Sequence, residues 1–277
     1  MTIAFRALVL NLVALDSGTL PGVIGELAHA AFYAAISAVD PDLSAHMHDS
    51  SERAAFTLSP LNGYLRSPHD RTIHVNPGQL GTLRICLLDD HLFEVFIQHL
   101  LSTALPTIRL GEIRLGITGV LGAPGSDPWV GYATLEDLRD LTATPDHWDL
   151  DFASPTAIRW GDADNGVRRV MLFPFPRMAI AGLRTRWDRL AGDTWGTAFE
   201  DWVERNVVVG RIWHWETHSF PFQKQTYHGG QGKLEYRVLD SSRSDYVAHL
   251  NRLLHFAFFA GIGYKTTHGL GQMRVVS

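Results

Sequence analysis

The chain has 277 residues, of which 45% are apolar and 19% are charged, a composition typical of a folded protein with one large domain or two smaller ones. No run approaches the roughly 20 consecutive apolar residues of a membrane-spanning helix, so we expect no membrane partner. The single cysteine, Cys86, excludes an internal disulfide. Because the first residues also lack the pattern of a secretion signal, we expect a cytoplasmic protein.

The charges are distributed unevenly along the chain. The formal net charge of −5 disfavours a polyanionic partner, but residues 205–277 carry nine Lys or Arg against four Asp or Glu. All three lysines, Lys224, Lys233 and Lys265, lie in this segment. We therefore predict that a polyanion binds the C-terminal part of the chain, with a genomic preference for Arg over Lys as the alternative explanation.

The first half of the chain shows the order strand, helix, two strands, helix, strand. Apolar periodicity predicts a helix from Pro21 to Asp40, and Asp89 and Asp90 open a second helix that runs to residue 101. Strands are expected at residues 3–15, 55–61 and 108–120, and a polar loop at residues 42–53. Extended segments near residues 71–75 and 83–88 supply the remaining strand of this order. This order is the split βαβ arrangement of ferredoxin-like folds.

The second half repeats the same order of elements. Strands are expected at residues 149–160, 207–215, 233–238 and 273–276, and helices at 177–190, 196–203 and 245–260. The turn-rich run at residues 122–128 is the best boundary candidate. We therefore predict an α+β protein of two tandem ferredoxin-like (RRM-like) domains, residues 1–123 and 124–277, with a glycine-rich loop near the C-terminus.

The glycine-rich loop follows the last predicted helix and spans residues 261–271. Gly261, Gly263, Gly269 and Gly271 flank a segment that contains Lys265. Glycine lets a backbone approach a phosphodiester closely, and consecutive N–H groups can then hold an anion. The loop is not a nucleotide P-loop, because it follows a helix and precedes a strand. A tight helix-to-strand connection is the alternative interpretation.

Several segments in the same order make this chain resemble a known family. They are the glycine-rich loop, the His48–Asp49 pair with Phe56–Thr57 eight residues after the histidine, the stretch at residues 152–156 and the stretch at residues 232–236. The chain resembles the CRISPR-associated repeat-processing endoribonucleases (Cas family six) of the repeat-associated RNA-binding (RAMP) superfamily. The resemblance implies two ferredoxin-like domains and no cofactor. It also implies cleavage of CRISPR repeat RNA in the precursor transcript, without a metal, to give 2′,3′-cyclic phosphate and 5′-OH ends and mature guide RNA.

The resemblance also assigns candidate catalytic residues. His48 matches the family's loop histidine, and Tyr33 matches its catalytic tyrosine. The family's lysine has no counterpart, since Ala54 stands at its place, and the nearest cation is Arg53, which can stabilise phosphorane charge but cannot donate a proton. His46 is a candidate to assist or replace His48, and His29, one helical turn before Tyr33, is a weaker candidate.

RNA is expected to bind the second half and the groove between the domains. Cations there would contact phosphates, and aromatic rings would stack on bases. The candidate polar residues are Arg211, His214, Lys224, Lys233, Arg237 and Lys265, and the candidate rings are Trp213, Trp215, Tyr227 and Tyr264. Because Trp213 and Trp215 alternate on a predicted strand, they share a face, and burial of both in the core is the alternative.

Two other functions stay open at this point. His46 and His48, two residues apart, would suit a metal-dependent hydrolase, although such pairs usually follow a strand and have further ligands downstream. A non-catalytic CRISPR RNA-binding subunit would use the basic second half alone. The resemblance further allows other CRISPR effector proteins as partners, and a homodimer.

Overall fold

The protein is described by a computed structural model that covers residues 3–49, 55–64, 72–166, 168–222 and 225–276. It forms two compact units. The first comprises Met1–Thr134, Phe220–Lys224 and Thr267–Gly269, and the second comprises Leu135–Ser219, Gln225–Thr266 and Leu270–Ser277. None of the described helices is both long enough and apolar enough to span a bilayer.

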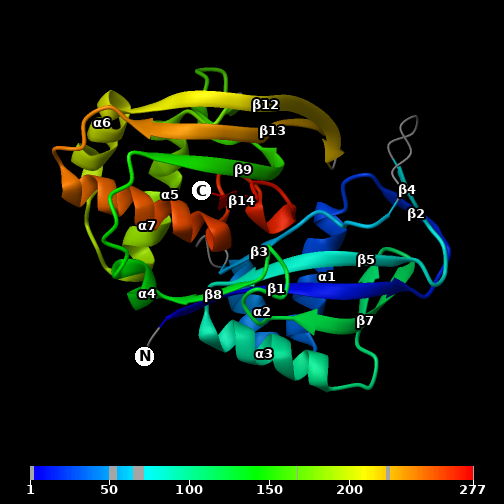
Figure 1. The fold of residues 1–277 in the computed structure, drawn as a ribbon. Helices are drawn as coiled ribbons and strands as arrows, with labels where there is room; N and C mark the ends of the chain where they lie inside the picture. Colours follow the sequence, from blue (N-terminus) through cyan, green and yellow to red (C-terminus); the bar gives the residue numbers. More distant parts are fainter. Residues whose placement is uncertain (1–2, 50–54, 65–71, 167, 223–224, 277) are drawn as a thin grey trace. The chain divides into compact units, whose positions relative to one another are not determined.

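The first unit is built on a sheet with the order β3-β5-β1-β7-β6 (Figure 1). Its strands are β1 (Ala4–Ala14), β2 (Gly18–Pro21), β3 (Phe56–Leu58), β4 (Thr72–Val75), β5 (Leu80–Leu87), β6 (Thr107–Leu110), β7 (Ile113–Leu121) and β8 (Gly131–Thr134), and its helices are α1 (Gly25–Ser37), α2 (Pro41–Asp49) and α3 (Asp90–Leu101). The central strand β1 pairs antiparallel with β5 along one edge and with β7 and β8 along the other. Leaving out β6, this is the strand order of a ferredoxin-like sheet.

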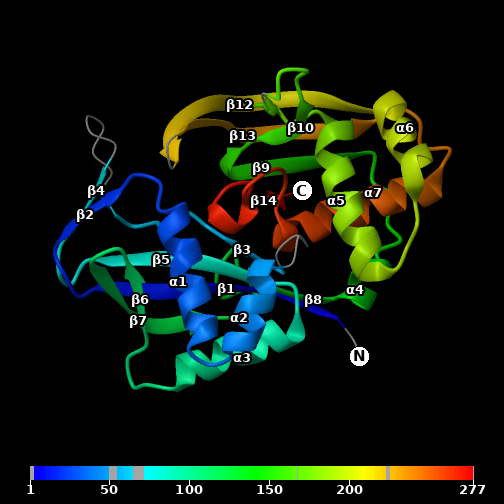
Figure 2. The ribbon, with the colours of Figure 1, turned by 180° about the vertical axis from the view of Figure 1, so that it is seen from behind.

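The second unit has the sheet order β12-β13-β9-β14, with its helices on one side of the sheet (Figure 2). Its strands are β9 (His147–Thr156), β10 (Ile158–Asp162), β11 (Arg168–Met171), β12 (Val207–Phe222), β13 (Gln225–Val238) and β14 (Met273–Val275), and its helices are α4 (Leu135–Arg139), α5 (Pro176–Ala191), α6 (Gly196–Asn206) and α7 (Ser244–Ala260). A short 3-10 helix, Thr266–His268, lies in the glycine-rich loop. The predicted α+β class with two ferredoxin-like arrangements is confirmed.

Some predicted elements are wrong in detail. The predicted strand at residues 108–120 is a hairpin, because Gly111 adopts a φ of +61° and turns β6 back into β7. The predicted strand at residues 149–160 ends at Thr156, and β10 pairs instead with β11 in a separate two-stranded sheet. The extended segment expected near residues 71–75 forms β4, which pairs with β2 in a two-stranded sheet that the sequence did not predict.

The polar loop expected at residues 42–53 is helical over Pro41–Asp49. Asp40 starts this helix, since its side chain accepts a hydrogen bond from the Leu43 N–H at 2.8 Å. Pro41 occupies the first turn, where its missing N–H costs no hydrogen bond. The Asp40–Pro41 pair was interpreted only as the end of the preceding helix, but it also starts the next one.

The turn-rich run at residues 122–128 joins β7 to β8. Strand β8 pairs with β1 in register from Ala4 opposite Thr134 to Ala7 opposite Gly131. The run therefore lies within the first compact unit, which extends to Thr134 in this part of the chain. The division at residues 123 and 124 stays a prediction.

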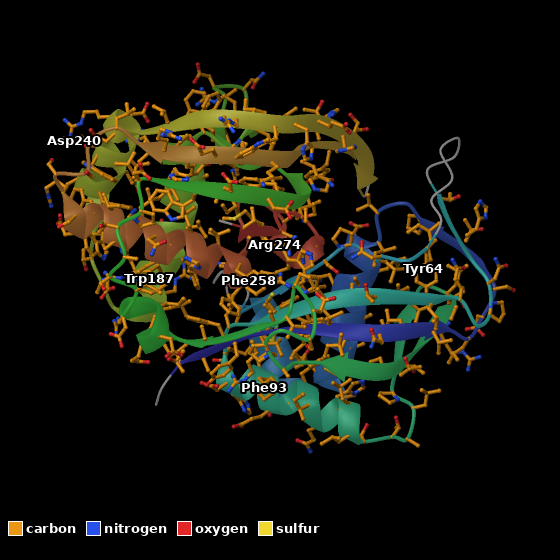
Figure 3. All side chains as sticks on the ribbon, viewed as in Figure 1. Tyr64, Phe93, Trp187, Asp240, Phe258 and Arg274 are labelled. Atoms are coloured by element: carbon orange, nitrogen blue, oxygen red, sulfur yellow. The ribbon has the colours of Figure 1, made fainter. Side chains whose placement is uncertain are left out.

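His249 on α7 is a fully buried histidine in the core of the second unit. Its ring stacks on Trp195 with centroids 3.9 Å apart, and Trp187, labelled in Figure 3, lies 6.2 Å away. Neither ring nitrogen has a hydrogen-bond partner among the described residues. Burial, aided by the charges of Arg252 and Arg184, lowers the pKa of His249 to about 3. The ring is therefore neutral in the folded protein at ordinary pH.

This burial predicts a pH-dependent stability. The folded pKa of His249 is about 3 and its ordinary value is 6.5, so between these values the unfolded chain binds more protons than the folded chain. His249 should therefore lower the free energy of unfolding by about 1.4 kcal/mol per pH unit as the pH drops below 6.5, in addition to the effects of His99 and His255, whose pKa values burial also lowers. In His249→Phe, which keeps the stacked ring, the contribution of His249 to this slope should be lost. Thermal unfolding at pH 7.5 and pH 5 measures it, with the exposed His214→Phe as control. An equal pH slope in His249→Phe and wild type would contradict the prediction.

Candidate functional site

One stripe of helix α1 carries the candidate site. Gly25, His29 and Tyr33 follow one another at four-residue intervals, which places them on one side of the helix. The neighbouring stripe, Ala28 and Phe32, is buried in the core of the first unit. Tyr33 belongs to the same core, and the ring of His29 is partly exposed, so the stripe holds its polar rings at the border of the core.

Tyr33 joins α1 to the end of α2. Its hydroxyl donates a hydrogen bond to the carbonyl oxygen of Met47 at 3.2 Å, and its side chain is nearly buried. Burial raises the pKa of Tyr33 above its usual value of 10.0, so the phenol keeps its proton at neutral pH. Because Met47 directly precedes His48, this bond holds the backbone next to His48 against the tyrosine.

His29 lies within ring-contact distance of three other rings. The centroid of its ring is 4.7 Å from that of Tyr33, 5.7 Å from that of Phe56 on β3, and 4.3 Å from that of His268. The two histidine rings are nearly parallel, with an interplanar angle of 18°. Two imidazoles and a phenol thus form one cluster, a combination suited to proton transfer near neutral pH.

The glycine-rich loop brings His268 to α1 through close backbone contact. A Cβ atom at Gly25 would lie 2.1 Å from the carbonyl oxygen of His268. Gly269, with a φ of +85°, lies against Ser59, whose carbonyl oxygen would be 3.1 Å from a Cβ there. Thr267 Oγ1 lies 2.8 Å from Nδ1 of His268. The loop segment is therefore seated on α1 and on the chain after β3.

The other predicted catalytic residues are placed in part. His46 lies on α2 with an exposed side chain. His48 lies in the same helix, but its side chain, like the whole of Arg53, falls outside the described residues. Among the side chains that the structure does describe, no three His, Cys, Asp or Glu lie together as a metal site. The roles of Tyr33, His46, His48 and Arg53 stay predictions.

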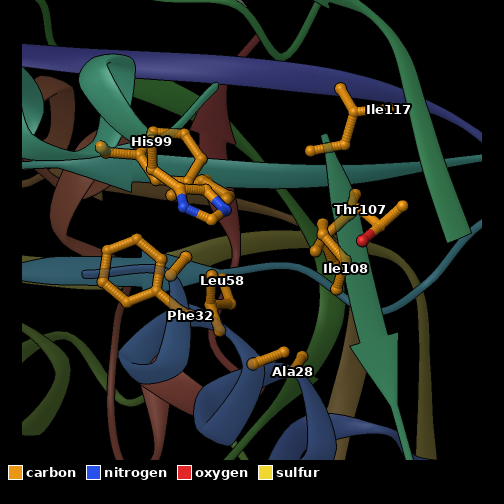
Figure 4. A pocket seen from close by; sticks show the side chains of 12 residues that line it. Ala28, Phe32, Leu58, His99, Thr107, Ile108 and Ile117 are labelled. Carbon is orange, nitrogen blue, oxygen red and sulfur yellow. The ribbon is translucent and has the colours of Figure 1, made fainter. Parts of the chain in front are cut away.

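A pocket along the neighbouring stripe of α1, at Ala28 and Phe32, is apolar (Figure 4). Ala28, Phe32, Leu58, Ile108 and Ile117 line it, together with other apolar residues and the polar His99 and Thr107. Burial lowers the pKa of His99, which keeps that ring neutral. The pocket therefore offers no fixed positive charge to a phosphate, and we do not assign the reaction to it.

The predicted cations of the second unit surround Trp213 on β12. Trp213 is 40% exposed, and Nζ of Lys233 lies 4.6 Å and the guanidinium of Arg211 5.6 Å from its ring centroid. Lys233 also lies 3.4 Å from a carboxylate oxygen of Asp149. An exposed indole flanked by cations suits a base with its phosphates. Lys224, predicted for the same surface, lies outside the described residues.

The remaining residues predicted on these strands divide between surface and core. His214 is exposed, whereas Trp215 is partly buried, donates to the Leu172 carbonyl and contacts Phe152 edge-on. Arg237 Nε donates to the buried carboxylate of Glu235 at 2.8 Å, so it neutralises a charge of its own strand. Of the two tryptophans, only Trp213 is exposed, so only Trp213 offers a ring face on the surface.

At the other loop glycines, atoms of the second unit fill the space that a side chain would need. A Cβ at Gly271 would lie 2.0 Å from the Ile262 carbonyl oxygen, and one at Gly263 would lie 2.4 Å from that of Ala157. A Cβ at Gly261 would lie 2.9 Å from Thr266. These contacts require glycine without any ligand, as in the tight-connection interpretation, and RNA binding by the glycines stays a prediction. Lys265 adopts a φ of +62°, which a non-glycine residue rarely does, and Tyr264 beside it stacks on Tyr227 at 6.1 Å.

Sequence reasoning missed His268 and ranked His29 below Tyr33 and His48. The four-residue spacing of His29 and Tyr33 was the available signal, and it was used. Nothing in local periodicity links residue 268 to residue 29, because only the tertiary fold brings them together. Within the glycine-rich loop, the sequence singles out Tyr264 and Lys265 but not His268.

Comparison with known proteins gives consistent matches over the whole chain. The family model of the CRISPR Cas6 N-terminal domain matches residues 5–140, and that of the CRISPR-associated endoribonuclease Cas6 matches residues 150–273. A product complex of a Cas6 protein called TTHB231 is 26% identical, with a TM-score of 0.81 over 98% of this chain and 99% of that one. No curated protein matches in sequence.

Two further solved structures have the same fold. A second structure of TTHB231, a Cas6 protein from Thermus thermophilus, is 26% identical, with a TM-score of 0.72 over 100% of this chain and 99% of that one. A Cas6-related protein from Pyrococcus furiosus is 12% identical, with a TM-score of 0.67 over 99% of each chain, and bears on the fold alone.

The contact between Gly25 and His268 predicts that adding a methyl group at residue 25 lowers the stability of the protein. Gly25→Ala should destabilise the protein by about 1–3 kcal/mol, because the new Cβ would overlap a backbone carbonyl. Gly182→Ala on α5 is the matched control, since a Cβ there meets nothing within 4 Å, and it should be neutral or stabilising. Urea denaturation of the two variants measures the difference. Equal stability of Gly25→Ala and Gly182→Ala would refute the contact.

Proposed function

The chain belongs to the Cas6 family of CRISPR-associated endoribonucleases, which process CRISPR repeat RNA, and we propose that it cuts this RNA without a metal ion. In the proposed reaction a ribose 2′-oxygen attacks the adjacent phosphorus and the bond to the 5′-oxygen breaks. One group takes the 2′-hydroxyl proton and another donates a proton to the leaving oxygen. The products are a 2′,3′-cyclic phosphate and a 5′-hydroxyl.

The observation that carries this proposal is the joining of α1 and α2 through Tyr33. Its hydroxyl lies 3.2 Å from the carbonyl oxygen of the residue before His48, and the ring of His29 lies 4.7 Å from its ring. An imidazole and a phenol are thereby held together on one side of α1, next to the backbone that leads into His48. This geometry supports the proposal of acid–base chemistry.

The proposed roles follow from the chemistry of each residue type. Tyr33, whose pKa is raised by burial, remains protonated and orients the reacting groups as a hydrogen-bond donor. His48 and His29 exchange protons with the 2′-oxygen and the leaving oxygen, and His46 is the substitute for His48. Arg53 stabilises the negative charge that develops on the phosphorane, a role that needs no proton transfer.

The second unit is proposed to bind the RNA. Exposed Trp213 offers a face for a base, and Arg211 and Lys233 beside it offer charge for phosphates. Lys265 and Tyr264 of the glycine-rich loop extend this set. Arg237, paired with Glu235, contributes less net charge than the sequence suggested.

Three further expectations from the resemblance stay predictions. They are transfer of the product to other CRISPR effector proteins, formation of a homodimer, and a cytoplasmic location. The ring cluster on α1 argues against the alternative of a non-catalytic RNA-binding subunit. The alternative of a metal-dependent hydrolase is decided by the first experiment below.

The mechanism predicts which substrates are cut. Repeat RNA should be cleaved in EDTA, and a 2′-deoxy substitution at the nucleotide before the scissile phosphate should abolish cleavage, because the nucleophile is then absent. Gel analysis of end-labelled RNA measures both, and the 5′ fragment should carry a cyclic phosphate. Cleavage of the deoxy substrate would exclude attack by the 2′-hydroxyl. Loss of cleavage in EDTA would favour the metal-dependent hydrolase, and binding without cleavage would favour the RNA-binding subunit.

Tyr33 has a matched control in the same unit. Tyr33→Phe should slow single-turnover cleavage about 10- to 100-fold with little change in stability, because it removes only the orienting hydroxyl. Tyr64→Phe is the control, since Tyr64 is equally buried and its hydroxyl donates to the Gln79 carbonyl at 3.4 Å, outside the cluster. Equal cleavage rates for the two variants would remove Tyr33 from the mechanism.

The choice between the two histidines of α2 is tested by substitution. His48→Ala should reduce cleavage at least 100-fold while RNA binding persists, and His46→Ala should have a smaller effect. Single-turnover rates and filter binding separate the chemical step from affinity. If only His46→Ala abolishes cleavage, the assignment of His48 is wrong.

A further inference from the structure

His268 differs from the other residues of the glycine-rich loop in what it contacts. Gly261 and Gly271 contact their own loop and Gly263 contacts Ala157, whereas the ring of His268 contacts the ring of His29 on α1. Segment Thr267–Gly269 belongs to the first compact unit, although the residues on both sides of it belong to the second. The loop therefore contributes one side chain to the cluster on α1.

The ring of His268 is held from two directions. Its Nδ1 lies 2.8 Å from the hydroxyl oxygen of Thr267, which limits rotation of the ring. Its backbone carbonyl fills the space that a side chain at Gly25 would need, four residues before His29 on the same helix. The orientation of the His268 ring and its position along α1 are thus determined by contacts with Thr267 and Gly25, not by the stacking on His29.

The stacked geometry acts on His29. The two rings lie 4.3 Å apart at 18°, and the ring of Tyr33 lies 4.7 Å from His29. A histidine on a helix surface has several rotamers, and a parallel neighbour of fixed position favours the one that stacks. The ring of His268 therefore restricts His29 to one orientation beside the ring of Tyr33.

We propose that His268 is a positioning residue for RNA cleavage, acting by stacking on His29 to hold that ring in its reactive orientation. This inference rests on the proposed function, because it takes His29 as a proton-transfer group. It requires an aromatic ring at position 268 and no proton transfer by that ring.

Single-turnover cleavage of repeat RNA and binding of its uncleavable 2′-deoxy form test the proposal. His268→Ala should lower the rate constant about tenfold with an affinity within twofold of wild type, because the stack affects orientation and not RNA contact. His268→Phe, which restores a flat ring without nitrogens, should recover most of the rate. His147→Ala, a histidine whose Nδ1 is likewise bonded at 2.6 Å, to Asp146, should cut at the wild-type rate.

A double substitution identifies the route of the effect. In the His29→Ala background, where Tyr33 and His48 still support slow cleavage, His268→Ala should cause no further loss. Three results would overturn the proposal. The losses of His29→Ala and His268→Ala could be additive, His268→Phe could cut as slowly as His268→Ala, or His268→Ala could cut at the wild-type rate. If His268→Ala fails to fold, the cleavage rates of His268→Phe and His268→Leu are compared instead, and the proposal expects the faster rate for His268→Phe. Failure of the wild-type protein to cut would instead reject the proposed function.

Discussion

The candidate site depends on one close backbone contact, between Gly25 at the start of α1 and the carbonyl of His268 in the glycine-rich loop. A single methyl group at Gly25 would occupy the position of that oxygen. The contact brings together segments from opposite parts of the chain, and His29 and Tyr33 follow along the same stripe of the helix. Tyr33 then reaches the end of α2 through the Met47 carbonyl. Three separate segments are thus aligned on one helix.

The two units share a topology but carry different side chains on the helix that follows the first strand. In the first, the helix after the opening strand carries histidine and tyrosine beside its buried face. In the second, the corresponding helix α5 carries Arg184, which is paired with Asp188 and Glu200, and Arg186, which donates to the Ala260 carbonyl at the end of α7. The side chains of α5 therefore stabilise their own unit, and the exposed rings and cations lie on the strands. The same fold thus supports different sites according to which residues occupy the helix stripe.

Most elements were predictable from the sequence because their signals are local. Apolar periodicity defined β1, α1, α3 and α7, and the order of elements pointed to the ferredoxin-like arrangement. Asp40–Pro41 was ambiguous, since the same pair ends one helix and starts another, so α2 was predicted as loop. The candidate site was predicted in part through spacing, in Tyr33 and His48. His268 was out of reach, because its position beside His29 is created by tertiary packing and no pattern near residue 268 encodes it.

The order in which the ribosome makes the chain gives the contact of Gly25 with His268 a further consequence. Helix α1 emerges early and can fold on β1 and β5 without the later residues, since its buried stripe packs within the first unit. The ring cluster, however, stays incomplete until the glycine-rich loop has been synthesised and has seated on α1. On this arrangement a nascent chain completes the ring cluster only after nearly all of the two units has been made.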